Sequence, residues 1–194
     1  MNLTSNLLNR PKALLDTTVF ISAIISPGVS IALLNAAMAS RFQPVISNVC
    51  MWEFIRHASR GIKVGKTTIS LTWDEIVDFL DYYVFPALQD QEITNSTVSR
   101  ENFELIRLLT ETTTLEQAIH ALSSVSKEQA AALLEREESK VPLYRYDIND
   151  AHVWMTAIET KCDFIVTSNS NKFPEYIGNI RRIHPVEFAK LIDV

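Results

Sequence analysis

The sequence predicts an α/β fold in which a central parallel sheet is covered by helices. Short apolar runs at 13–15, 44–46 and 164–166 are bounded by polar residues, and IRRI at 180–183 is a fainter fourth run. Continuous apolar runs of this length are typical of strands buried on both faces. Long segments with helical periodicity separate the runs, and strands that alternate with helices favour parallel pairing through crossover connections.

Four segments between or after these runs are predicted to be helices. Their apolar residues recur at helical spacing over 30–40, 48–60, 72–88 and 150–161. The start at Thr72 is strengthened by Glu75, because a Thr followed three residues later by Glu forms a capping box in which each side chain satisfies a free backbone donor.

The middle of the chain contains no strand candidate between residues 99 and 140. Three helix starts are expected there, at Ser99, at Thr114 with Gln117, and at Ser126 with Gln129. We therefore expect a single domain over 1–194 in which 90–140 is a helical insertion. Two interpretations stay open for it, a hairpin or lid packed on the side of the α/β core, or an arm that binds a partner or forms a dimer.

Composition excludes several classes of protein. Of the 194 residues, 47% are hydrophobic and 21% are charged, as in an ordinary globular domain. No apolar stretch has the length of a membrane span, so we expect a cytoplasmic protein without membrane contact. The net charge of -5 means that any nucleic acid must bind at a local basic patch. The distant Cys50 and Cys162 are expected to be reduced thiols in the core.

Polar residues follow two of the predicted strands. Asp16 ends the first apolar run, and TSNSN at 167–171 follows the run FIV. In an open parallel sheet the loops at the carboxyl ends of the strands meet in a crevice, so these residues are expected to converge. Each also has a structural interpretation, because Asp is a good helix N-cap and Ser and Asn are common in turns.

Asp150 heads the apolar stripe of its predicted helix. The stripe continues through Val153, Trp154, Ala157 and Ile158. A first-turn carboxylate also interacts favourably with the helix dipole, with Asp147 or Asn149 as the cap. That interpretation explains an acid in the first turn but leaves its position on the apolar stripe unexplained.

Glu53 lies on the polar side of its helix. Arg56, His57 and Arg60 share that side, which is compatible with a solvated surface. If this side instead lines the crevice, Glu53 can bind a metal while the basic residues meet phosphate. Asp16, Glu53 and Asp150 would then form an all-oxygen cluster suited to Mg²⁺ or Mn²⁺ and to phosphodiester hydrolysis.

The residues around these acids resemble the successive motifs of PIN domains, named for the PilT N-terminus. The segments are LLDTTVFISAIISPG, RFQPVISNVCMWEF, DINDAHVWMTAIETKCDFIVTSNSNKF and IRRIHPVEFAKL. The resemblance implies a Rossmann-like α/β/α sandwich, frequent homodimers, and Mg²⁺- or Mn²⁺-dependent cleavage of RNA, as in toxins that are paired with an antitoxin protein. Asp16, Glu53 and Asp150 fall on the first three acidic positions of the family pattern and would be catalytic.

The resemblance also assigns further residues and shows two departures. Asn169 would complete the metal ligands, with Thr18, Ser168 and Asn171 in support, and Arg56, Arg60 and Lys172 would contact RNA. Thr18 replaces the usual Asn, and Asn169 stands where the family has an acid. Because an amide offers an oxygen without charge, we expect a second metal ion to bind weakly or not at all.

Two other functions remain open. The first is a PIN-fold module that binds RNA or protein without cleaving. The second is a nucleotide-binding or haloacid-dehalogenase-like protein. It is disfavoured because no GxGxxG or GK(S/T) phosphate-binding loop is expected and Thr18 replaces the second Asp of the DxD pattern. We also expect Trp52 and Trp154 in the core, and His152 at the surface or in a hydrogen bond.

Overall fold

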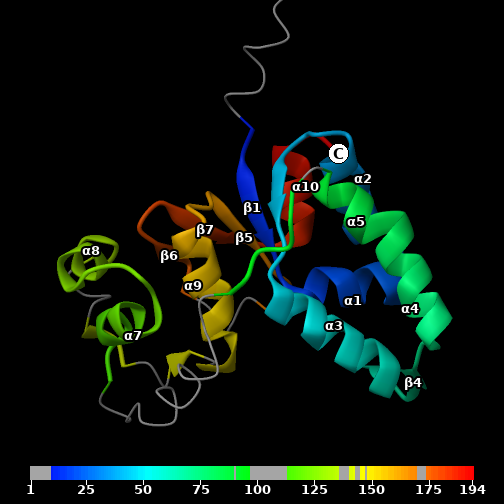
Figure 1. Cartoon of the computed structure of the whole chain (residues 1–194), viewed down its shortest axis with the longest axis horizontal. Coiled ribbons are helices and arrows are strands. Elements are labelled where there is room, and N and C mark those ends of the chain that lie inside the picture. The colour runs from blue at the N-terminus through cyan, green and yellow to red at the C-terminus, as the bar shows by residue number, and fades with distance from the viewer. Residues whose placement is uncertain are drawn as a thin grey trace, which may run out of the picture.

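A mostly parallel sheet of five strands lies at the centre of the molecule. A computed structural model of the chain describes residues 10–89, 91–96, 113–135, 140–142, 145–146, 148–169 and 174–194. The strand order is β2-β1-β5-β7-β6, and only β6 is antiparallel to its neighbour (Figure 1). The strands are β1 (Lys12–Leu15), β2 (Gln43–Val45), β5 (Phe164–Val166), β6 (Tyr176–Ile177) and β7 (Ile180–Ile183). The α/β prediction and all four predicted strands are confirmed.

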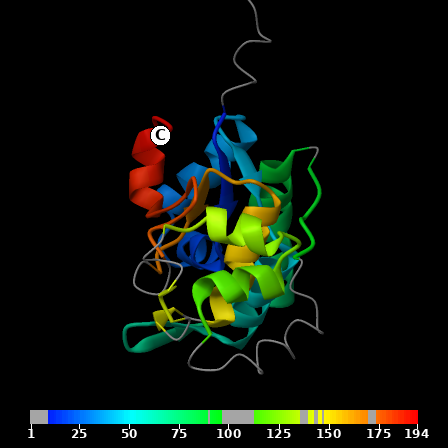
Figure 2. The same ribbon diagram turned by 90° about the vertical axis from the view of Figure 1, so that its left-hand side faces the viewer.

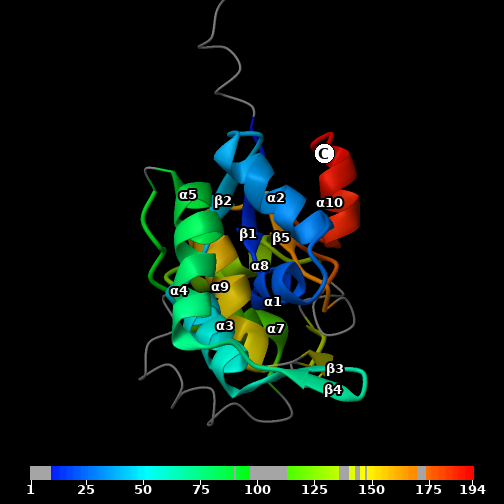
Figure 3. The same ribbon diagram turned by 90° about the vertical axis from the view of Figure 1, so that its right-hand side faces the viewer.

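Helices cover both faces of the sheet (Figures 1 and 3). One face carries α1 (Thr17–Ile25), α2 (Val29–Met38), α3 (Asn48–Arg60), α4 (Trp73–Phe79), α5 (Phe85–Leu88) and α10 (Pro185–Leu191). The other face carries α7 (Leu115–Leu122), α8 (Lys127–Ala132) and α9 (Ala151–Glu159). The result is an α/β/α sandwich with one apolar core on each side of the sheet.

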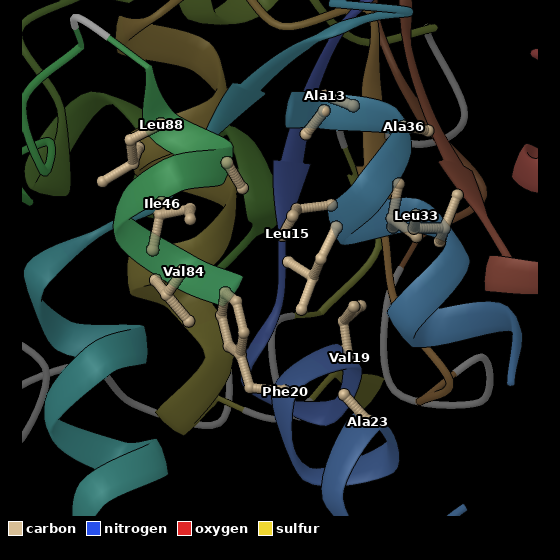
Figure 4. Close-up of a cluster of buried hydrophobic side chains, with 14 of the residues drawn as sticks. Ala13, Leu15, Val19, Phe20, Ala23, Leu33, Ala36, Ile46, Val84 and Leu88 are labelled. Atoms are coloured by element: carbon tan, nitrogen blue, oxygen red, sulfur yellow. The ribbon is translucent and has the colours of Figure 1, made fainter. Parts of the chain in front are cut away.

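Alternate residues of each strand enter opposite cores. Ala13 and Leu15 of β1 pack in the core formed with α1 and α2, whereas Leu14 between them packs in the core formed with α9. Successive strand side chains point to opposite faces, so a strand covered on both sides must be apolar throughout. Figure 4 shows Leu15 among Phe20, Leu33 and the other side chains of the first core.

The predicted helices form, with one interruption. Asn48–Arg60 is α3 as expected, and the Thr72–Glu75 capping box at the start of α4 is present. The predicted helix at 72–88, however, contains a π-helical turn at Leu80–Val84. Pro86 explains the interruption because proline lacks a backbone donor and its ring clashes with the carbonyl one turn earlier.

The described part of the middle segment consists of two short helices packed against α9. The capping boxes of Thr114 with Gln117 and Ser126 with Gln129 are both present. Ile119 and Leu122 of α7 lie in the same core as Trp154, and Figure 2 shows α7 and α8 in front of the sheet. The expected helix start at Ser99 lies outside the described residues, and the insertion at 90–140 stays a prediction.

A short hairpin of β3 (Ile62–Val64) and β4 (Thr67–Ile69) was not predicted. It projects from the end of α3 (Figure 3). Gly61 has φ +111°, and a Cβ there would lie 2.5 Å from the Thr68 side chain, so only glycine suits this junction. Gly-Lys-Thr at 65–67 resembles part of a phosphate-binding loop, but here it joins antiparallel strands and not a strand to a helix.

Four side chains were predicted to lie in the core, and one of these predictions is wrong. Trp154 is 5% exposed, and Cys50 and Cys162 are free thiols buried in the core, as expected. Trp52 is 67% exposed and not in the core. The apolar side of α3 is occupied by Met51, Phe54 and Ala58, which leaves Trp52 facing away from it.

Among the described residues, no helix taken singly has the length and apolarity of a membrane span. Helices α1 and α2 reach the length and apolarity of a membrane span only when they are counted together, across a bend of 116°.

Phe54 should contribute strongly to the free energy of unfolding. Its ring is fully buried and lies 6.0 Å from Phe20 and 5.2 Å from Phe79. Replacing Phe54 with Ala should cost about 3–5 kcal/mol because it leaves a cavity, measured by chemical denaturation. The matched control Tyr82→Ala removes a ring that is 69% exposed and should cost much less. Equal losses in the two variants would contradict the assigned packing.

Candidate functional site

The site lies where the order of the strands reverses. From β1 the chain crosses to β2 on one side, and later returns to β5 on the other side of β1. The loops that leave two such strands diverge, which opens a crevice at their carboxyl ends. The Asp16 N–H donates to Val166 O at 3.1 Å, so the residues that follow β1 and β5 start side by side.

Asp16 is held by two threonine hydroxyls. Its carboxylate oxygen Oδ2 accepts hydrogen bonds of 2.8 Å from Thr18 Oγ1 and from Thr167 Oγ1, and the residue is only 5% exposed. Asp16 occupies the N-cap position of α1, but its side chain makes no capping hydrogen bond. The helix-cap interpretation is therefore wrong, and the carboxylate is directed across the end of the sheet.

Thr18 and Ser168 connect the loops that follow β1 and β5. The Ser168 N–H donates to Thr18 Oγ1 at 3.1 Å, while Thr18 itself donates to Asp16. The Asn169 N–H donates to Thr167 Oγ1 at 2.9 Å. The structure thus brings together the predicted residues Asp16, Thr18, Ser168 and Asn169. Thr167 was missed as a site residue, although its position directly after an apolar strand is a signal for one.

Asp150 joins the same network through Asn169. It ends a short 3-10 turn at Ile148–Asp150 and precedes α9, again without a side-chain cap bond. Asn169 Nδ2 donates to Asp150 Oδ2 at 3.1 Å. A continuous chain of hydrogen bonds therefore runs from Asp150 through Asn169 and Thr167 to Asp16.

Glu53 reaches the crevice from α3. The helix begins after Ser47, whose hydroxyl accepts from the Cys50 N–H at 3.1 Å. Glu53 Oε2 accepts a 2.8 Å hydrogen bond from Thr17 Oγ1, the residue next to Asp16. Its side chain is 27% exposed. Glu53 thus lies at the crevice and is not a purely solvated surface residue.

His152 is the main residue that sequence reasoning misplaced. It is 2% exposed, and its Nε2 lies 3.6 Å from Glu53 Oε2. Both ring nitrogens lack a hydrogen-bond partner among the described residues. The expectation of a surface or hydrogen-bonded residue is wrong, because His152 is buried on α9 where that helix faces Glu53 of α3.

Glu53 and His152 shift each other's pKa. Burial alone would raise the pKa of Glu53, but His152, Thr17 and the charge of Arg56 together hold it below 4.5. Burial lowers the pKa of His152, while contact with Cys50 and Glu53 outweighs burial and raises that pKa to about 10. The pair therefore carries opposite charges near neutral pH.

Two of the predicted basic residues, Arg56 and Arg60, are exposed on α3. Arg56 lines a pocket together with Val49, Trp52, Glu53, Asn149 and His152. Arg60 is exposed at the last turn of the helix. The predicted residues Asn171 and Lys172 lie outside the described residues.

The residue types at the site suit a hard divalent cation, whereas their spacing does not form a ready cage. Carboxylate and amide oxygens are the ligands that Mg²⁺ and Mn²⁺ prefer. Within the described residues, no group of three or more His, Cys, Asp or Glu side chains is arranged to hold a metal ion. Glu53 instead faces His152, and Asp150 faces the Asn169 amide.

The fold and site define an α/β/α protein with an acidic crevice at the switch point of a parallel sheet. A family model described as the PIN domain matches residues 12–171, so the chain belongs to the PIN domain family. PIN domains are typically metal-dependent nucleases.

A solved structure from Rickettsia felis is similar to this chain. The crystal structure of VapBC2 from Rickettsia felis, bound to a DNA fragment from their promoter, is 18% identical with a TM-score of 0.46. The match covers 89% of this chain and 98% of that chain. No curated protein matches this sequence.

Removing the charge of Glu53 should lower the pKa of His152. In Glu53→Gln the attraction to the imidazolium is lost while burial remains, so the pKa should fall well below about 10. NMR titration of the His152 ring measures this shift, and the resonances of the exposed His184 in the same spectra serve as the control. An unchanged His152 titration would contradict the ion pair.

The same pair predicts how stability depends on pH. A folded pKa of about 10 against the ordinary 6.5 means that the His152 contribution is fully present below pH 6.5 and is lost as pH rises through about 10. The lowered pKa of Glu53 gives a contribution present above pH 4.5 and lost as pH falls through the folded pKa. Wild type should thus lose its stability advantage over Glu53→Gln at both ends of this window.

Proposed function

We propose that the protein is an Mg²⁺- or Mn²⁺-dependent endoribonuclease. The observation that carries the proposal is the linkage of Asp16, Thr167, Asn169 and Asp150 in one hydrogen-bonded chain at the switch point, with Glu53 held beside it by Thr17. Asp16, Glu53 and Asp150 fall on the first three acidic positions of the PIN pattern, and Asn169 stands at the position of the next acid. Family membership supports nuclease chemistry, and the resemblance of the motifs to PIN domains that cleave RNA supports RNA as the substrate.

Asp16, Glu53, Asp150 and the Asn169 amide oxygen would hold the metal ion. When bound, the ion would lower the pKa of a water molecule and stabilise negative charge on the phosphate. The chain's own residues prepare this site. Because both threonine hydroxyls donate to Oδ2 of Asp16, they orient the carboxylate without using Oδ1.

The remaining roles concern binding. Thr17 positions Glu53 through its 2.8 Å hydrogen bond. Arg56, Arg60 and Lys172 would contact the RNA backbone, since guanidinium and ammonium groups donate hydrogen bonds to phosphate oxygens. The homodimer, the function as a toxin and the antitoxin partner are implied by the motif resemblance and stay predictions.

Cleavage should depend on Asp16. Replacing Asp16 with Asn removes one negative charge and replaces one acceptor oxygen with an NH2 donor. Cleavage of a mixed RNA pool should therefore fall by about a hundredfold or more. Chelation of the metal should have the same effect. The matched control Asp74→Asn changes an exposed carboxylate on α4 and should cleave normally. Cleavage that survives in a folded Asp16→Asn variant would contradict the proposal.

Asn169 should weaken the binding of a second metal ion. Its amide donates to Asp150, and it adds no charge, so three carboxylates would face two divalent ions. Asn169→Asp removes that donor and adds a charge, and should tighten Mn²⁺ binding in calorimetry. Asn179→Asp, in the exposed turn before β7, adds the same charge away from the crevice and is the control. Two tightly bound Mn²⁺ ions in wild type would contradict this expectation.

The Asp150–Asn169 hydrogen bond also favours a second candidate, a PIN-fold module that binds RNA or protein without cleaving. An acid at position 169 would repel Asp150 without a cation between them, whereas the amide bonds to it directly. Tight RNA binding by wild type, with cleavage gained only in Asn169→Asp, would select this candidate.

A further inference from the structure

A pocket beside the acidic crevice combines an apolar wall with polar and charged groups. It lies between α3 and the start of α9 and is lined by Val49, Trp52, Glu53, Arg56, Asn149 and His152. Its volume of about 510 Å³ falls within the roughly 300–1,000 Å³ that small-ligand pockets occupy. Since Glu53 lies in both the crevice and the pocket, an occupant would be next to the proposed catalytic residues.

Trp52 presents its indole to solvent at this pocket. It is 67% exposed, although Trp is usually well buried. Arg56 follows one turn later on the same helix, so its guanidinium is within reach of the same face. An exposed indole beside a cation is the combination that binds an unpaired base and its phosphate, because every base stacks on an aromatic ring.

His152 provides a second, independent indication of a polar occupant. It is 98% buried, lines the pocket, and has two ring nitrogens without a hydrogen bond among the described residues. The contact of its Nε2 with Glu53, at 3.6 Å, is longer than a hydrogen bond. Buried polar groups are normally hydrogen-bonded. The His152 ring pairs with Glu53 by charge but has no hydrogen bond among the described residues, which favours a ligand that brings a polar atom to the pocket.

We propose that this pocket is a subsite for one nucleotide of single-stranded RNA, whose base stacks on Trp52 and whose phosphate pairs with Arg56. The proposal rests on the proposed function, because it places that nucleotide beside the bond to be cleaved. The net charge of -5 opposes general attraction of a polyanion, so stacking must supply much of the affinity. Bases inside a duplex are already stacked and cannot reach the indole, so the subsite selects unpaired RNA.

Binding of a labelled single-stranded RNA hexamer to the full chain, followed by fluorescence anisotropy in EDTA, tests the subsite without cleavage. Trp52→Ala should weaken binding about 5- to 150-fold, the equivalent of 1–3 kcal/mol of stacking. Trp52→Phe should retain most of the affinity. Trp73→Ala is the matched control, because this indole is 62% exposed on α4 and does not line the pocket.

Two further binding measurements test which part of the RNA occupies the pocket. Arg56→Gln should reduce the slope of log affinity against log salt by about 0.7, as expected for one phosphate of a single strand. A duplex of the same sequence should bind more weakly, and its affinity should not respond to Trp52→Ala. An equal loss for duplex and single strand would overturn the assignment of a stacked, unpaired base.

The outcomes separate this proposal from the nuclease. RNA binding that depends on Trp52, without cleavage under any metal condition, supports the subsite and contradicts the nuclease. Cleavage with affinity indifferent to Trp52→Ala supports the nuclease and overturns the subsite. Undetectable binding of single-stranded RNA by wild type also overturns the subsite. The same holds if Trp52→Ala alters the oligomeric state but leaves the affinity for RNA unchanged.

Discussion

The hydrogen bond from Thr167 to Asp16 is the constraint on which the rest of the site depends. It joins the ends of β1 and β5, where the backbone pairing has already placed the two residues together. A carboxylate that is 5% exposed needs such partners, because burying a charge without them is costly. Once Thr167 is oriented by this bond, its hydroxyl also accepts from the Asn169 N–H and so sets the direction of Asn169 toward Asp150.

The three carboxylates of the crevice are each satisfied in a different way. Asp16 is bound by hydroxyls, Glu53 by a hydroxyl and an imidazole, and Asp150 by an amide. Because each negative group already has a partner from the chain, the crevice can form without an external cation. The same arrangement explains why the described carboxylates do not converge into a three-ligand group. A metal ion that bound here would therefore compete with internal partners, above all with His152.

The sequence predicts the framework of the fold well and the interior of the site less well. Strands such as Phe164–Val166 are recognisable because a strand covered on both faces must be apolar throughout. Asp16 and Asn169 follow from the same logic, since Asp16 comes directly after β1 and Asn169 lies in the loop that follows β5. The burial of His152 could not be predicted. A histidine among apolar residues gives the same sequence pattern whether it lies at the surface or contacts Glu53 on a neighbouring helix. Pro86 and Gly65 are local signals for the π-helical turn and the hairpin, but the periodicity and the capping box of 72–88 predict a helix without showing where it is interrupted.

Helix α3 links the stability of the fold to the chemistry of the site. Trp52, Glu53 and Phe54 are consecutive, and each residue of a helix is rotated by about 100° from the last. They consequently face solvent, the crevice and the apolar core, respectively. The packing of Phe54 against Phe20 and Phe79 sets the rotation of the helix about its axis. That rotation in turn directs Glu53 toward Thr17 and leaves Trp52 exposed at the adjacent pocket, so a core residue that touches no ligand determines the geometry of both binding surfaces.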